Sequence, residues 1–131
     1  MNVLVVEDSR FLRMENERAL TKAGHKVIIA ADGEEGLRLA RGCKPDLVVL
    51  DMLLPHLSGP DVLRAIRKDP ETATIPVMVL SSLPQCNAEK LVGEGATAYF
   101  QKAQLRLDKE TDKFVDAVEH LLALTRRTAM S

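Results

Sequence analysis

The chain has 131 residues, of which 46% are hydrophobic and 28% charged, so it can fold as one globular domain around one core. Its formal net charge of -1 and its 3% of aromatic residues argue against direct nucleic-acid binding through a basic face or a base-stacking platform. No apolar run is long enough to cross a bilayer and no leader segment opens the chain, so we expect a cytoplasmic protein with no membrane contact.

The cysteines and histidines predict neither a disulfide nor a zinc site. Cys43 and Cys86 are far apart in a leaderless chain, so we expect both to be reduced and to behave as small hydrophobic residues. The histidines His25, His56 and His120 are not closely spaced with one another or with the cysteines. Zinc sites have characteristic ligand spacings, and this sequence shows none of them.

Short apolar runs alternate with longer amphipathic stretches. Gly24 and Gly42 follow the first two amphipathic stretches and predict helix ends. The third helix has several start signals, because Ser58 can cap it, Asp61 follows at capping-box spacing and Pro60 lies in the first turn. In chain order we expect a strand at Asn2–Val6, a helix at Ser9–Ala23, a strand at Lys26–Ala31, a helix at Gly33–Arg41, a strand at Asp46–Leu50, a helix at Ser58–Lys68, a strand at Ile75–Leu80, a helix at Gln85–Gly93, a strand at Thr97–Gln101 and a helix at Asp108–Arg126.

The first, third and fourth expected strands are continuous apolar runs rather than alternating ones. Such runs are typical of strands covered on both faces, as in a parallel sheet with helices above and below. Five strand–helix units therefore predict a doubly wound α/β fold, with residues 1–131 forming one domain.

Polar residues follow four of the expected strands, at the edge of an open parallel sheet where ligands bind. Alone, each has a simpler explanation: Asp8 or Ser9 can cap a helix, and the others can be ordinary turn or solvated residues. Clustered carboxylates repel one another, however, and hard oxygen ligands suit Mg²⁺, which together favour phosphoryl transfer to an ionised aspartate. The residues are Glu7, Asp8, Asp51, Ser81, Ser82 and Lys102.

Four motifs, taken together, resemble the receiver domain of two-component response regulators. The match covers nearly the whole chain, from the first motif to the last helix. The motifs are LVVEDS at Leu4–Ser9, LVVLDMLLPHLSG at Leu47–Gly59, VLSS at Val79–Ser82 and AYFQK at Ala98–Lys102. The resemblance implies a flavodoxin-like fold with strand order 2-1-3-4-5. It also implies a signalling switch rather than an enzyme, which receives a phosphoryl group from a sensor histidine kinase or a histidine phosphotransfer protein and acts on a downstream protein target.

The resemblance also implies a role for each matching residue. Asp51 is the expected phosphoacceptor, and Tyr99 is expected to follow Ser81 when the switch moves. The expected Mg²⁺ ligands are Asp8, Asp51, the backbone carbonyl of Leu53 and, through water, Glu7; the expected phosphoryl contacts are Lys102 and Ser81.

The sequence departs from the family pattern at three positions. Ala103 follows Lys102 where the family often has a cis-proline, so we expect a trans bond and a reshaped loop there. Ser81 replaces the commoner threonine and lacks its stiffening methyl group. Ser82 replaces a small apolar residue, and its hydroxyl is expected to contact either the phosphoryl group or the backbone.

Apolar residues suggest two further properties. Leu53 and Leu83 flank the acceptor in sequence and cannot orient a water, so we expect the acyl phosphate to hydrolyse slowly. Phe11 and Met14 share one face of the first helix. Phe11 is expected either to pack at the edge of the core or, as the resemblance implies, to belong to a docking surface for the phosphodonor.

Three alternatives remain open from the sequence. The chain resembles stand-alone receivers, but a receiver trimmed from a longer regulator or hybrid kinase would look the same. A pseudo-receiver that binds partners without phosphorylation is disfavoured by Asp8, Asp51 and Lys102. A flavin binder or phosphatase is disfavoured because the acidic pair would repel a phosphate and no separate acid–base group is evident.

Overall fold

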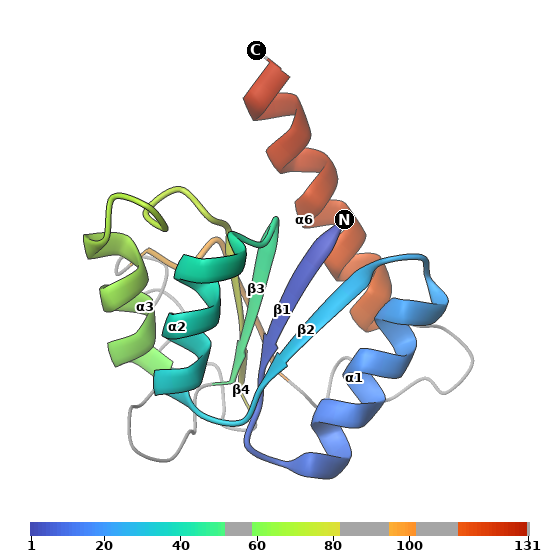
Figure 1. Ribbon diagram of the computed structural model, residues 1–131. Coiled ribbons are helices and arrows are strands. Elements are labelled where there is room, and N and C mark those ends of the chain that lie inside the picture. The colour runs from blue at the N-terminus through green and yellow to red at the C-terminus, as the bar shows by residue number, and fades with distance from the viewer. Residues whose placement is uncertain (52–58, 82–94, 102–112, 131) are drawn as a thin grey trace.

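A five-stranded parallel sheet in the order β2-β1-β3-β4-β5 forms the centre of the molecule. The computed structural model describes residues 1–51, 59–81, 95–101 and 113–130 (Figure 1). The elements are β1 (Asn2–Val6), α1 (Arg10–Lys22), β2 (Lys26–Ala30), α2 (Gly33–Cys43), β3 (Leu47–Asp51), α3 (Gly59–Lys68), β4 (Val77–Ser81), β5 (Ala98–Gln101) and α6 (Lys113–Met130). The doubly wound fold and the strand order are as expected.

The two faces of the sheet carry separate hydrophobic clusters. Helices α2 and α3 lie on one side of the sheet and α1 and α6 on the other (Figure 1). Along β1, Leu4 and Val6 belong to the first cluster while Val3 and Val5 belong to the second, and all four are buried. This two-sided burial explains why residues 3–6 of the strand form a continuous apolar run, as the sequence predicted.

Helix α1 begins and ends one residue inside the predicted range Ser9–Ala23, whose two end residues are its caps. Ser9 is its N-cap, and the Ser9 hydroxyl accepts a hydrogen bond from the Leu12 N–H at 3.4 Å. At the other end, Gly24 has a φ of 97°, a left-handed conformation that glycine adopts without steric cost.

The predicted end of α2 at Gly42 is wrong. The helix continues to Cys43, and Lys44 caps it with a φ of 46° and an N–H bond to the Ala40 carbonyl at 3.1 Å. Pro45 gives the physical reason, because a proline disfavours the right-handed helical conformation at the residue before it. Cys43 is a free thiol, as expected, but it is exposed and does not pack as a core residue.

The remaining differences concern element boundaries. The N–H of Ile75 donates to the Thr72 carbonyl at 3.0 Å, so Ile75 belongs to a turn and β4 starts two residues later than predicted. Strand β3 includes Asp51, and α6 continues to Met130. The predicted helix at 85–93, the Ser58 cap and the start of the last helix lie outside the described residues.

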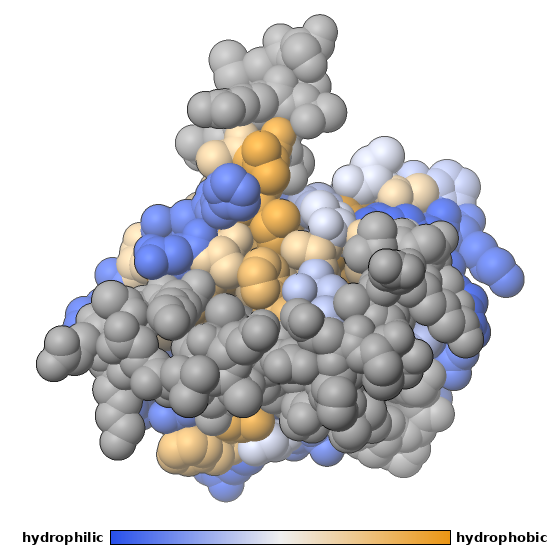
Figure 2. All heavy atoms as spheres, turned by 180° about the vertical axis from the view of Figure 1, so that it is seen from behind, coloured by the Kyte–Doolittle hydropathy of each residue, from blue (hydrophilic) through white to orange (hydrophobic). Residues whose placement is uncertain are grey.

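Helix α6 is long relative to the sheet. It has 18 residues, whereas the strands have four or five, and in Figure 1 its C-terminal turns extend past the edge at which the strands begin. The face containing α6 is seen in Figure 2, where apolar atoms gather along the helix; Leu124 on α6 is 45% exposed. Within the part of the chain that the structure describes, no helix has both the length and the apolar character needed to cross a membrane.

Candidate functional site: an acidic cluster at the sheet edge

Three carboxylates meet at the carboxyl ends of β1 and β3. These strands pair in parallel with Val6 opposite Leu50, so Glu7 and Asp51 each follow one member of the same pair. Asp8 is the next residue along the chain. One carboxylate oxygen from each of Glu7, Asp8 and Asp51 lies within 4.8 Å of the others. The structure therefore brings together the carboxylates that the sequence analysis placed at this edge.

The burial of the three carboxylates is unequal. Glu7 is 2% exposed and Asp51 is 5% exposed, whereas Asp8 is exposed to solvent. Like charges at this separation repel, and burial weakens the screening by water that normally reduces such repulsion. A bound dication would offset the repulsion, because carboxylate oxygens are the ligands that Mg²⁺ prefers. The donor set thus fits a magnesium ion, with Asp8 on the solvent-exposed side.

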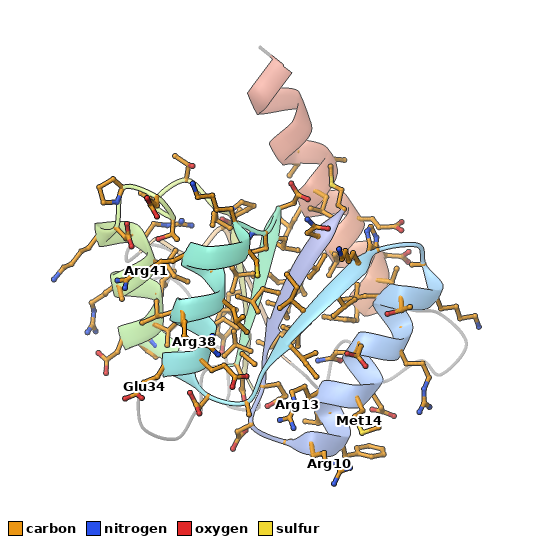
Figure 3. All side chains as sticks on the ribbon, in the orientation of Figure 1. Arg10, Arg13, Met14, Glu34, Arg38 and Arg41 are labelled. Carbon is orange, nitrogen blue, oxygen red and sulfur yellow. The ribbon has the colours of Figure 1, made fainter. Side chains whose placement is uncertain are left out.

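The loop after β1 is held by several hydrogen bonds. The Glu7 N–H donates to the Ala30 carbonyl of β2 at 3.0 Å, and the Ser9 N–H donates to a Glu7 carboxylate oxygen at 3.4 Å. Arg13 of α1 donates from Nη1 to the carbonyl oxygens of Glu7 at 2.9 Å and of Asp8 at 3.4 Å. In Figure 3, Arg13 points from α1 back toward the end of β1.

Arg13 is not among the site residues predicted from the sequence. Long helical side chains lean toward the N-terminus of their helix, so a cation one turn past a helix cap reaches the loop that precedes the helix. An arginine four residues after Ser9 therefore predicts a contact with the preceding loop, but the sequence does not show which atoms of that loop it meets.

Other predicted site residues are placed by the strand register. Asp51 pairs with Leu80, and Ser81 follows and pairs with Gln101, the residue before Lys102 in the sequence. The backbone of Ser81 therefore lies one position past the strand pair formed by Asp51. The side chain of Ser81 lies outside the described part of the structure, as do all atoms of Leu53, Ser82, Leu83, Lys102 and Ala103.

Two further residues have assigned positions. Tyr99 on β5 pairs with Val79, is half-buried and packs against the hydrophobic cluster beneath α2 and α3. Asp32, at the end of edge strand β2, caps α2 instead of joining the acidic cluster. Its carboxylate accepts the Glu35 N–H at 2.8 Å, and the Glu35 side chain accepts the Ala31 N–H at 3.2 Å.

Comparison with known proteins identifies the family of this chain. The model of the response regulator receiver domain matches residues 3–111. Protein PilH of Pseudomonas aeruginosa is 37% identical over 111 residues, which cover 83% of this chain and 88% of PilH. The transcriptional regulatory protein AfsQ1 of Streptomyces coelicolor is 42% identical over 81 residues, which cover 62% of this chain but only 35% of AfsQ1.

The fold is shared with solved receiver structures. The receiver domain of the Francisella response regulator 1452 superimposes with a TM-score of 0.83 at 26% identity, covering 95% of this chain and 98% of that one. The family match over residues 3–111, the five-stranded parallel sheet and the acidic cluster at its edge all indicate the same family. The chain therefore belongs to the response regulator receiver domain family, whose members act as signalling switches in two-component systems.

Proposed function

We propose that this chain accepts a phosphoryl group on Asp51 from a phosphohistidine of a sensor kinase or a histidine phosphotransfer protein. The observation that supports the proposal is the convergence of Glu7, Asp8 and Asp51 within 4.8 Å in a member of the receiver family. In this reaction a carboxylate oxygen of Asp51 forms a bond to phosphorus while the phosphorus–nitrogen bond of the donor breaks, and the imidazole leaves with the bonding electron pair.

The remaining residues of the site support this transfer. Asp8, Asp51 and the Leu53 carbonyl would hold Mg²⁺ directly and Glu7 through water, and the ion would supply positive charge near the acceptor and the incoming oxygens. The ammonium of Lys102 and the hydroxyl of Ser81 would stabilise two further phosphoryl oxygens. Because Asp51 is nearly buried, donor and acceptor meet with little competing water.

The phosphoryl group would then change a partner-binding surface. Ser81 would move toward the phosphoryl group and Tyr99, half-buried on the neighbouring strand, would follow, so that a local charge change biases two arrangements. We propose that residues 1–131 act as one cytoplasmic receiver whose output is a contact with a protein and not directly with nucleic acid. Relatives such as AfsQ1 are named transcriptional regulators and are longer than this chain.

Incubation with acetyl phosphate and Mg²⁺, followed by intact mass measurement, tests the proposal. The wild type should gain the mass of one phosphoryl group, and Asp51→Asn should gain none because its amide is not a nucleophile for phosphorus. Asp116→Asn removes the charge of an exposed carboxylate on α6, so it is the matched control and should react like the wild type. An adduct that persists in Asp51→Asn would show that another residue is the acceptor and would reject the assignment. A wild type that stays unmodified would also reject it, and would favour a binding module that works without phosphorylation.

The α1 surface is suited to dock the phosphodonor. Phe11 is 67% exposed and Met14 is 45% exposed, which rules out packing of Phe11 at the core edge. They lie one helical turn apart on the element that follows the acidic pair, and Arg10 projects from the same end of α1 in Figure 3. Exposed aromatic and apolar side chains of this kind mark protein-binding surfaces.

We expect Phe11→Ala to slow phosphotransfer from the cognate histidine donor roughly tenfold, because a buried aromatic anchor in an interface contributes more than about 1 kcal/mol. Phosphorylation by acetyl phosphate should stay unchanged, since that small donor needs no docking surface. Ile29→Ala, which truncates a 36% exposed residue on edge strand β2, provides the control. Equal slowing with both donors would show that Phe11 supports the site and not docking.

A further inference from the structure

A side chain outside the predicted set of site residues holds the backbone of the acidic pair. Arg13 is half-buried on the second turn of α1, and one nitrogen, Nη1, donates to the Glu7 carbonyl at 2.9 Å and to the Asp8 carbonyl at 3.4 Å. The shorter distance is that of a strong hydrogen bond and the longer one that of a weak bond. Arg13 therefore connects α1 to both acidic residues through their main chain.

This contact acts at the place where the loop is under electrostatic stress. The carboxylates of Glu7 and Asp8 lie within 4.8 Å of each other and of Asp51. In the absence of a cation their repulsion favours a loop that opens and separates them. Strand β2 restrains Glu7 through its N–H bond to Ala30, but the described contacts give the Asp8 main chain an anchor only through Arg13.

We propose that Arg13 is a positioning residue for the magnesium site, which keeps Glu7 and Asp8 in a ligand-ready arrangement before the ion arrives. The inference rests on the proposed function and adds a residue that touches neither metal nor phosphoryl group. Its bonds end on carbonyl oxygens, so the guanidinium fixes the main chain from which the two carboxylates project. Residues that orient metal ligands in this way raise affinity by reducing the reorganisation that binding requires.

The sign of the change in Mg²⁺ affinity separates this role from the simplest alternative. A cation near the site also repels an incoming dication, so loss of a mere counter-charge would tighten Mg²⁺ binding. Loss of a positioning residue would weaken Mg²⁺ binding, because part of the binding free energy would be needed to bring the separated carboxylates together. A residue that only supports the fold would change thermal stability and leave the affinity for Mg²⁺ unaltered.

Calorimetric titration of the full chain with Mg²⁺ provides the test. Arg13→Met removes the donors and the charge but keeps an unbranched stem, and we expect it to weaken Mg²⁺ binding about tenfold. Arg13→Gln keeps a donor without the charge and should recover part of the loss, while Arg13→Lys keeps both and should recover most of it. Arg18→Met, which removes an exposed arginine from the same helix, should bind like the wild type.

Thermal unfolding in chelator checks that each variant is folded. If Arg13→Met does not fold, the Mg²⁺ affinities of Arg13→Lys and Arg13→Gln are compared instead, and the lysine variant should bind more tightly. Mg²⁺ affinity in Arg13→Met and Arg13→Gln equal to that of the wild type, or tighter, overturns the inference. If the wild type binds Mg²⁺ and is phosphorylated on Asp51 while the Arg13 variants bind equally well, only this inference fails. If the wild type binds no Mg²⁺, the proposed function fails with it.

Discussion

Replacing Asp51 with asparagine should stabilise the protein when no divalent ion is present. Asp51 and Glu7 are nearly buried and share their site with Asp8, with ligand oxygens within 4.8 Å of one another. Two like charges at that distance repel by about 3 kcal/mol at an effective dielectric constant of about 20. The amide keeps the shape and removes one of the three charges. We expect the free energy of unfolding to rise by about 1–2 kcal/mol, since relaxation of the loop already relieves part of the repulsion.

Magnesium should reverse this order of stability. An ion that binds only the folded state stabilises the wild type by about 2.7 kcal/mol at a hundred times its dissociation constant, which exceeds the advantage of Asp51→Asn in chelator, whereas Asp51→Asn has lost a ligand and should gain much less. Chemical denaturation in chelator and in Mg²⁺ measures both effects. Asp116→Asn makes the same change in net charge outside the cluster and should respond like the wild type. An Asp51→Asn variant that is less stable than the wild type in chelator would show that the three carboxylates do not strain the fold.

The central strands and the polar residues at their ends could be predicted from the sequence, because both follow from burial of the strands on two faces. A strand buried on both faces is apolar throughout, so the first charged residue after it marks the edge of the sheet. This places Glu7 after Val6, and Asp51 falls at the last position of β3. Parallel pairing then brings the carboxylates together without any knowledge of loop structure.

Helix ends were less readable, because several residues compete to end a helix. At the end of α2, Gly42 permits a turn but does not require one, whereas Pro45 constrains its predecessor, and the helix continues until Lys44. The role of Arg13 was missed for a related reason. A long side chain reaches across several residues, and only the three-dimensional path of the loop shows which carbonyls it meets.

Arg67 anchors three backbone carbonyls away from the acidic cluster, and its removal should cause a large loss of stability. Its Nε donates to the Gly95 carbonyl at 2.9 Å, and its Nη1 donates to the carbonyls of Ala73 at 3.0 Å and Ile75 at 2.6 Å. The guanidinium is half-buried, and burial lowers the pKa of Arg67. One side chain at the end of α3 thus bonds to carbonyls in two segments that are distant from each other in the sequence, the turn at residues 73–75 and the backbone at Gly95.

The backbone at Gly95 is shaped around this side chain. Gly95 has a φ of 115°, and a Cβ atom added there would lie 2.8 Å from Cγ of Arg67. Two residues later, the Thr97 N–H donates to the Val77 carbonyl at 2.9 Å and the Thr97 hydroxyl accepts from the Val77 N–H at 3.1 Å; β5 begins at the next residue. Arg67 therefore fixes the start of the strand that carries Tyr99.

We expect Arg67→Met to lower the free energy of unfolding by about 2–4 kcal/mol, because three bonds from a charged donor are lost and the carbonyls are left partly dehydrated. For a chain of this size the melting temperature should fall by roughly 10 °C. Arg67→Lys should recover less than half of the loss, since one ammonium cannot reproduce the planar fork that reaches three carbonyls.

Arg64→Met is the matched control for this anchor. Arg64 is an exposed arginine on the same helix and pairs with Asp61 at 2.8 Å, an ion pair of a kind that contributes about 0.5 kcal/mol or less. If Arg67→Met were no less stable than Arg64→Met, the three carbonyls would be equally well satisfied by water. The entry to β5 would then not depend on Arg67, and α3 would hold Tyr99 only through the hydrophobic cluster beneath it.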